Sequence, residues 1–162
     1  MMNTYYWKNK FPGYTSLIYR DGKQVGYLNV NGFTKNADGE LEGQKFRFDN
    51  RGFFRQETRI MDRNRSRELA TISHNGWNNS ATITYGNKQI SWKYQNIWHT
   101  RWQMSDDSRM KIENVGSPYS GNLVSDVNDP LLVLTGIYIA NSFRLAFTAV
   151  FVVLFVVIIA SS

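Results

Sequence analysis

The chain divides into a long strand-like part and a short apolar part at its C-terminal end. Over most of the first 130 residues, apolar positions alternate with polar ones in short runs separated by turns. From Leu131 to Ser162 the pattern changes, because Arg144 is the only charged residue and nearly all the others are apolar. Alternation with a period of two is typical of half-buried strands, whereas a continuous apolar run belongs in a protein core or in a bilayer.

Short strands are predicted about every ten residues, most of them in hairpins. Asp21-Gly22 is a strong two-residue hairpin signal, and Asp38-Gly39 marks a further turn. About ten strands are expected, at residues 14–20, 24–30, 44–49, 53–62, 67–73, 80–85, 88–94, 98–105, 109–114 and 121–124. A sheet of this size tends to close, and its interior then needs filling. The predicted fold class is therefore mainly β, an antiparallel β-barrel around a C-terminal apolar helix.

The helix is predicted to begin at about residue 129. Pro130 suits the first helical position, and Asp129 or Asn128 suits the N-cap. Residues 131–143 would fill the barrel, and Gly136 would let a strand approach closely. The residues expected to plug the barrel are Leu131, Leu134, Ile137 and Tyr138.

A single helix over the whole apolar run would be about 45 Å long, half as long again as the ~30 Å hydrocarbon layer. It would place Arg144 near the bilayer centre, at a cost of several kcal/mol. Two segments hinged at Arg144 are therefore predicted. The barrel domain takes residues 1–144, and residues 145–162 form a candidate transmembrane anchor. Its membrane-facing residues would be Val150, Phe151, Leu154, Phe155 and Ile158.

The composition and the absence of known motifs limit the kinds of site that we expect in this chain. The net charge is +6, and all 13 acidic residues precede Leu131. There is no cysteine, so disulfides and thiolate metal sites are excluded. His74 and His99 have no acidic or histidine neighbour at ligand spacing, so we expect turn or strand-surface residues and no metal site. No nucleotide-binding, zinc-protease or serine-hydrolase motif occurs, so we expect no catalytic residue and no cofactor.

Residues 45–67 hold eight cationic residues against three acidic ones. Five arginines in this stretch have odd numbers and would share the outer side of their strands unless a bulge intervenes. Such a patch attracts phosphate, and anionic lipid is the candidate partner. A solvated barrel wall is the alternative, and nucleic acid is not favoured because the alternation assigns most aromatic residues to the inner face. The candidate contacts are Arg55, Arg59, Arg63, Arg65 and Arg67.

The chain resembles the tubby C-terminal-like superfamily, which includes tubby proteins, phospholipid scramblases and LURP-one-related proteins. The matching features are Phe46-Arg47-Phe48, Trp92-Lys93-Tyr94, the pair Trp98 and Trp102, and the helix start at residues 129–138. The resemblance covers about residues 4–144 and implies a barrel wrapped around a C-terminal helix. The cysteine-rich segment and acidic calcium-binding stretch of scramblases are missing, and the lysine and arginine pair of tubby proteins cannot be placed.

These observations predict a non-enzymatic, membrane-associated β-barrel. It would be a single-pass protein with the barrel facing the cytoplasm, because basic residues tend to stay on that side. The alternative is a soluble cytoplasmic barrel that binds a lipid or a small apolar ligand and buries its C-terminal helix in itself or in a homodimer. The sequence names no protein partner.

Overall fold

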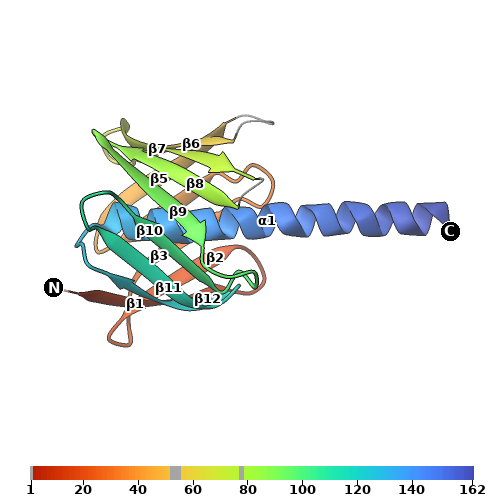
Figure 1. Cartoon of the computed structure of the whole chain (residues 1–162), viewed down its shortest axis with the longest axis horizontal. Coiled ribbons are helices and arrows are strands. Elements are labelled where there is room, and N and C mark those ends of the chain that lie inside the picture. The colour runs from red at the N-terminus through yellow and green to blue at the C-terminus, as the bar shows by residue number, and fades with distance from the viewer. Residues whose placement is uncertain (1, 52–55, 77–78) are drawn as a thin grey trace.

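The computed structural model describes residues 2–51, 56–76 and 79–162 and shows a barrel of strands with one helix running through it (Figure 1). Within these residues, twelve antiparallel strands precede the helix. In chain order they are β1 (Asn3–Lys10), β2 (Thr15–Arg20), β3 (Lys23–Val30), β4 (Ala37–Leu41), β5 (Gln44–Arg51), β6 (Glu57–Asp62), β7 (Arg67–Asn75), β8 (Ser80–Tyr85), β9 (Lys88–Tyr94), β10 (Arg101–Ser105), β11 (Lys111–Ser117) and β12 (Ser120–Ser125). The helix is α1 (Pro130–Ser161), with 32 residues.

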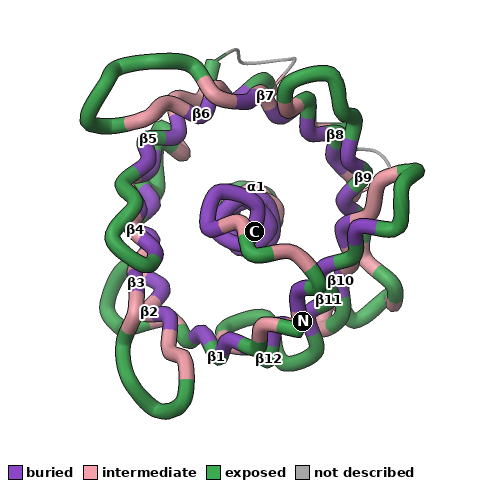
Figure 2. Tube along the Cα trace, turned by 90° about the vertical axis from the view of Figure 1, so that its left-hand side faces the viewer, coloured by how far each residue is buried: buried purple, intermediate pink, exposed green. Residues whose placement is uncertain are grey.

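The strands form an up-and-down barrel in which each strand pairs with its neighbours in sequence. β1 closes the ring by pairing with β12, in a register that runs from Asn3 opposite Ser125 to Lys8 opposite Ser120. Figure 2 looks along the barrel and shows α1 at its centre. The connections therefore alternate between two ends. We call the end where α1 leaves the barrel the mouth, formed by the connections after β1, β3, β5, β7, β9 and β11, and the other end the entry end.

This architecture confirms the predicted fold class, with twelve strands in place of about ten. β1 lacks a clear polar alternation, because Tyr6 is exposed between the buried Tyr5 and Trp7. β4 contains Asp38-Gly39, the dipeptide expected to form a turn. A Cβ on Gly39 would lie 3.3 Å from Leu134 Cδ1, so this glycine keeps the strand close to the helix.

Two further expectations differ from the structure. β10 begins at Arg101, so Trp98 lies in the β9–β10 connection instead of facing inward beside Trp102. The hinge expected at Arg144 is also absent, because α1 is one continuous helix. The guanidinium of Arg144 donates a hydrogen bond of 2.8 Å to the carbonyl oxygen of Pro118 at the mouth, so the charge is accommodated without a break in the helix.

The first half of α1 fills the barrel. It starts as the sequence indicates, since Pro130 is in the first turn and the Asp129 carboxylate accepts hydrogen bonds from the backbone nitrogens of Leu131 and Leu132 at 3.0 and 3.4 Å. Of the four expected plug residues, Leu131 is 2% exposed and the other three are fully buried. Their partners are the inward side chains of the strands, among them Ile18, Leu28, Phe48, Ile60, Ile72, Ile83, Ile90, Trp92 and Ile112.

Polar contacts fix the rotation and depth of the helix in this apolar interior. The Tyr138 hydroxyl donates to the Lys35 carbonyl oxygen at 2.7 Å and lies 3.3 Å from Thr58 Oγ1. One turn further on, Asn141 Nδ2 donates to Ser16 Oγ at 2.9 Å. These bonds join α1 to β2, to β6 and to the β3–β4 connection. A sliding or turned helix would leave these buried groups unpaired, at a cost of about 1–3 kcal/mol each.

We predict that Ile137→Asp lowers the free energy of unfolding by at least about 3–5 kcal/mol, because the barrel interior offers no partner for a buried charge. Val115→Asp is the matched control, since Val115 faces outward and is 47% exposed. It should cost about 1 kcal/mol or less. Chemical unfolding of the full chain in mild detergent, followed by tryptophan fluorescence, measures both. Equal stabilities would show that α1 is not required inside the barrel.

Candidate functional site

The second half of α1 leaves the barrel without a cover. Among the side chains that the structure describes, Leu145 is the last buried one, and the large side chains from Phe147 to Ile159 are more than half exposed. The five expected membrane-facing residues, Val150, Phe151, Leu154, Phe155 and Ile158, are 53–65% exposed. Residues 147–160 form a rod about 21 Å long with apolar side chains on every face. By length and composition alone, α1 could cross a membrane.

Arg144 lies where the helix passes the mouth. Its guanidinium is half-buried and sits 5.0 Å from the centre of the Tyr119 ring, besides its bond to Pro118. With the Asn9 amide oxygen turned toward it, Asn9 accepts hydrogen bonds from both terminal nitrogens of Arg144, at 2.5 and 2.6 Å. The charge is therefore held by the rim of the barrel. Arg144 marks the boundary between the buried and the exposed halves of α1.

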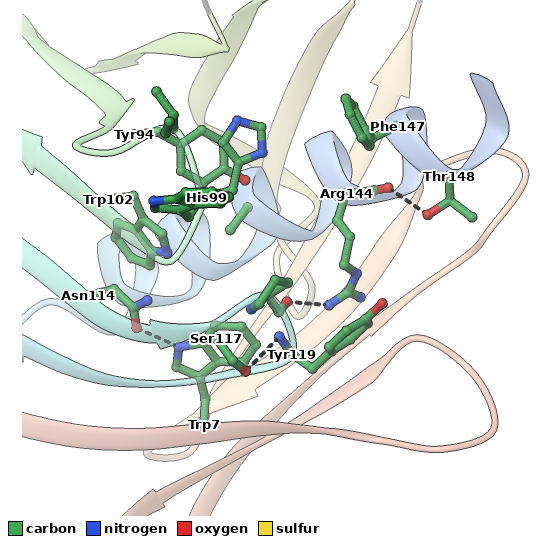
Figure 3. Close-up of a pocket in the computed structure, with 14 residues that line it drawn as sticks. Trp7, Tyr94, His99, Trp102, Asn114, Ser117, Tyr119, Arg144, Phe147 and Thr148 are labelled. Atoms are coloured by element: carbon green, nitrogen blue, oxygen red, sulfur yellow. Dashed lines mark hydrogen bonds between the residues drawn. The ribbon is translucent and has the colours of Figure 1, made fainter. Parts of the chain in front are cut away.

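A cavity of about 330 Å³ opens beside this boundary (Figure 3). Trp7 and Asn114 form its floor, with Trp7 Nε1 donating to Asn114 Oδ1 at 2.8 Å. Phe147 and Thr148 of α1 form one side of the cavity. The remaining walls are formed by Tyr94, Ile97, Trp98, His99, Trp102, Ser117, Pro118, Tyr119, Ala140 and Arg144. Half of the fourteen lining residues carry an aromatic ring, counting His99.

One wall of the cavity is a stack of rings that continues onto the exposed helix. The rings of Tyr94 and His99 are stacked with centroids 4.1 Å apart, and the Phe147 ring lies 6.2 Å from His99. Phe147 in turn contacts Phe151, with centroids 5.1 Å apart. Burial raises the pKa of the Tyr94 hydroxyl to about 12. The apolar surface of the helix is therefore continuous with the surface of the mouth.

His74 lies inside the barrel, which corrects the expectation of a turn or surface residue. Its ring contacts Tyr138 and Phe143 of α1, with centroids 6.3 and 5.8 Å apart, and its Nε2 is 3.2 Å from Thr58 Oγ1. Burial, with a smaller contribution from the charge of Lys35, lowers the pKa of His74 to about 4. In residues 2–51, 56–76 and 79–162, no group of three acidic or histidine side chains could hold a metal ion.

The described arginines of the set expected on one face all lie on the β6–β7 hairpin. Arg55 lies outside the described residues. The β6–β7 register shifts between Ile60 and Met61, which interrupts the alternation. Arg59 pairs with Glu68 at 3.7 Å and Arg63 with Asp38 at 3.8 Å. Arg63 and Arg65 lie in the β6–β7 connection and Arg67 starts β7, so all three lie at the entry end.

Another set of cations surrounds the mouth. Sequence reasoning missed it because its members come from strands far apart in the chain, and only closure of the barrel brings them to one end. Each is exposed and lies within three residues of the mouth end of its strand. We call Lys8, Lys10, Arg51, Lys93 and Arg101 the mouth cations. Among the described strand ends here, Glu57 lies exposed opposite Arg51, and the Asp38 side chain is 42% exposed.

No protein-family model, no curated protein and no solved structure matches this chain. The function is therefore argued from the geometry of the mouth and of the helix that leaves it.

We predict that stability falls by up to about 3 kcal/mol as the pH drops from about 6.5 to about 4, because the unfolded chain then binds a proton that buried His74 rejects. His74→Gln should remove this loss of stability. His99→Gln is the control and should retain the loss, because the His99 ring stacks on Tyr94 and has no contact with Thr58 among the described hydrogen bonds. Unfolding curves across this pH range test both variants. An unchanged pH dependence in His74→Gln would contradict the assignment.

Proposed function

We propose that the chain is a non-enzymatic β-barrel module held at a membrane surface by the exposed half of α1. One observation carries this proposal. The helix leaves the barrel as a continuous rod whose large side chains from Phe147 to Ile159 are apolar and exposed on every face. Such a surface is far from what a soluble monomer tolerates in water. A bilayer would cover it completely, and Arg144 would then stay at the mouth, outside the hydrocarbon layer.

The contact with anionic lipid belongs to the mouth cations in this proposal. β6 has six residues, so it spans about 20 Å, or about 15 Å along the axis of a barrel whose strands tilt by about 40°. Arg65 and Arg67 at the entry end would therefore lie beyond the Debye length of about 8 Å from the leaflet. Lys10, Lys93 and Arg101 would lie next to it. Each cation close to an anionic surface contributes about 1 kcal/mol.

The resemblance to the tubby C-terminal-like superfamily supports this proposal through its shared plan, a closed barrel around a C-terminal helix. The cytoplasmic orientation rests on Arg144, the one charged residue in residues 131–162, since basic residues beside a membrane segment tend to remain on the cytoplasmic side. The soluble alternative has to cover the exposed helix with a second copy, because the barrel of the same chain leaves residues 147–159 exposed.

Full-length protein is expected in the membrane fraction and should resist carbonate extraction, whereas a chain ending at residue 146 should be soluble and folded. A point variant tests the same idea at constant length. Leu154→Arg with Ile158→Arg should release the protein, because a charge deep in the bilayer costs about 2.5–3.5 kcal/mol. Leu154→Ala with Ile158→Ala is the control and should remain in the membrane. Soluble full-length protein, or a soluble dimer in crosslinking, would refute the anchor.

Reversing Lys10, Lys93 and Arg101 to Glu should weaken binding of the barrel, residues 1–146, to anionic vesicles by at least about tenfold. Raising the salt concentration should have the same effect on the unmutated barrel. The matched control reverses Arg59, Arg65 and Arg67, which should change binding much less. Co-sedimentation with vesicles measures all three proteins. A larger loss of vesicle binding in the arginine control would assign the lipid contact to the arginines that the sequence first suggested.

A further inference from the structure

Large hydrophobic side chains are exposed to solvent at the tips of the mouth loops. Phe33 in the β3–β4 connection is 100% exposed, and Ile97 and Trp98 in the β9–β10 connection are 84% and 75% exposed. Phe11 after β1 and Tyr119 after β11 are 68% and 50% exposed. We call these five side chains the collar. Figure 2 shows that β3 and β4 lie on the wall opposite β9 and β10, so the collar has members on both sides of α1.

The loops that carry the collar are held by defined hydrogen bonds. Asn31 Oδ1 accepts from the backbone nitrogens of Phe33 and Thr34 at 2.9 and 3.0 Å. Asn96 plays the same part in the β9–β10 connection, where its Oδ1 accepts from the backbone nitrogens of Thr100 and Arg101. Each asparagine folds its loop so that the apolar tip points away from the barrel. The exposure of the collar is therefore built into the loops.

The entry end has the opposite character. Within the described residues, its connections carry no exposed large hydrophobic side chain and nine charged residues, Asp21, Glu42, Arg63, Arg65, Asp106, Asp107, Arg109, Asp126 and Asp129. In the described parts of the mouth connections, the one charged residue is Lys35, which is half-buried and whose pKa is lowered by burial. The connections are thus charged at one end of the barrel and largely apolar at the other, and the helix leaves through the end with the apolar connections.

The length of the exposed helix points in the same direction. Residues 147–160 extend about 21 Å from the mouth, whereas the hydrocarbon layer is about 30 Å thick. With the mouth held away in water, this rod would reach little further than one leaflet. With the mouth in the headgroup layer, the rod uses its full length within the hydrocarbon. Aromatic side chains are also the residues that membrane proteins concentrate at the headgroup level.

We infer that the collar inserts into the headgroup layer of the bilayer around α1 and holds the barrel upright, with the entry end facing away from the membrane. The mouth cations then lie just above the collar, at the level of lipid phosphates. This inference rests on the proposed membrane anchor and goes beyond it, since a barrel tethered by α1 alone could tilt freely. The collar makes contact on opposite sides of the helix, so it removes that freedom.

The absence of cysteine allows the depth of single positions to be measured in the full chain. Spin labels are attached at Phe33→Cys and Trp98→Cys for the collar, at Asn64→Cys and Asn87→Cys for the entry end, and at Leu154→Cys for the anchor. The protein is reconstituted in vesicles of phosphatidylcholine and phosphatidylglycerol. Collision rates with oxygen and with a water-soluble nickel complex then report the depth of each label. Nickel collisions at 33 and 98 should be several-fold lower than at 64 and 87.

The outcomes separate the collar from the anchor. One outcome places the label at 154 in hydrocarbon while the labels at 33 and 98 show the same nickel collision rates as those at 64 and 87. In that case the anchor is supported and the collar is overturned. If only one of 33 and 98 is shielded, the barrel is tilted and the upright arrangement is overturned. A label at 154 exposed to water overturns both proposals. Shielding at 33, 98 and 154 with wet labels at 64 and 87 supports the collar.

A second measurement tests whether the collar side chains themselves hold the barrel. With the label at Tyr119→Cys, the double variant Phe33→Ser and Trp98→Ser should raise the nickel collision rate several-fold. Met2→Ser with Tyr6→Ser is the matched control, because these side chains are 67% and 42% exposed away from the collar. It should leave the rate unchanged. Equal rates in the two variants would show that α1 alone sets the position of the mouth.

Discussion

A closed barrel of twelve strands encloses more space than its own inward side chains can fill. Helix α1 supplies the missing volume, and the whole structure depends on this packing. The fit is close at Gly136, where a Cβ would lie 2.5 Å from Trp102 Cη2 and 2.9 Å from Met104 Sδ. Because the core of the barrel is a helix that continues outside it, anything that holds the outer half also holds the barrel.

The depth of the helix is set by its few buried polar groups, since apolar contacts alone would tolerate a shift along the axis. Tyr138 and Asn141 find partners in one position only, on Lys35 and Thr58 and on Ser16. This position places Arg144 at the rim, where a carbonyl, an amide and an aromatic ring satisfy its guanidinium. The polar contacts inside the barrel thus decide where the apolar rod begins.

The barrel and its helix could be predicted from sequence because their signals are local. Alternation marks most strands, and Asp129 with Pro130 marks the helix start. The role of Asp38-Gly39 could not be predicted from its neighbours in sequence. Gly39 lies within a strand, where its missing side chain leaves room for Leu134 of the helix. The group of residues that forms the mouth could not be predicted from the sequence. Phe33 and Trp98 are far apart in the chain, and only the alternation of hairpins around a closed ring puts them at one end.

In the proposed membrane arrangement, continuity of the helix also explains why polarity is sorted between the ends of the barrel. A domain joined to an anchor by a flexible linker could present any face to the membrane. No face of such a domain would need a polarity different from the others. Here α1 has no break between Pro130 and Ser161, and the same end of the barrel always faces the direction in which the rod points. Charged turns such as Asp106-Asp107 can therefore occupy the entry end, while Phe33 and Trp98 occupy the mouth. The rigid connection fixes the direction, and the two ends differ because that direction is fixed.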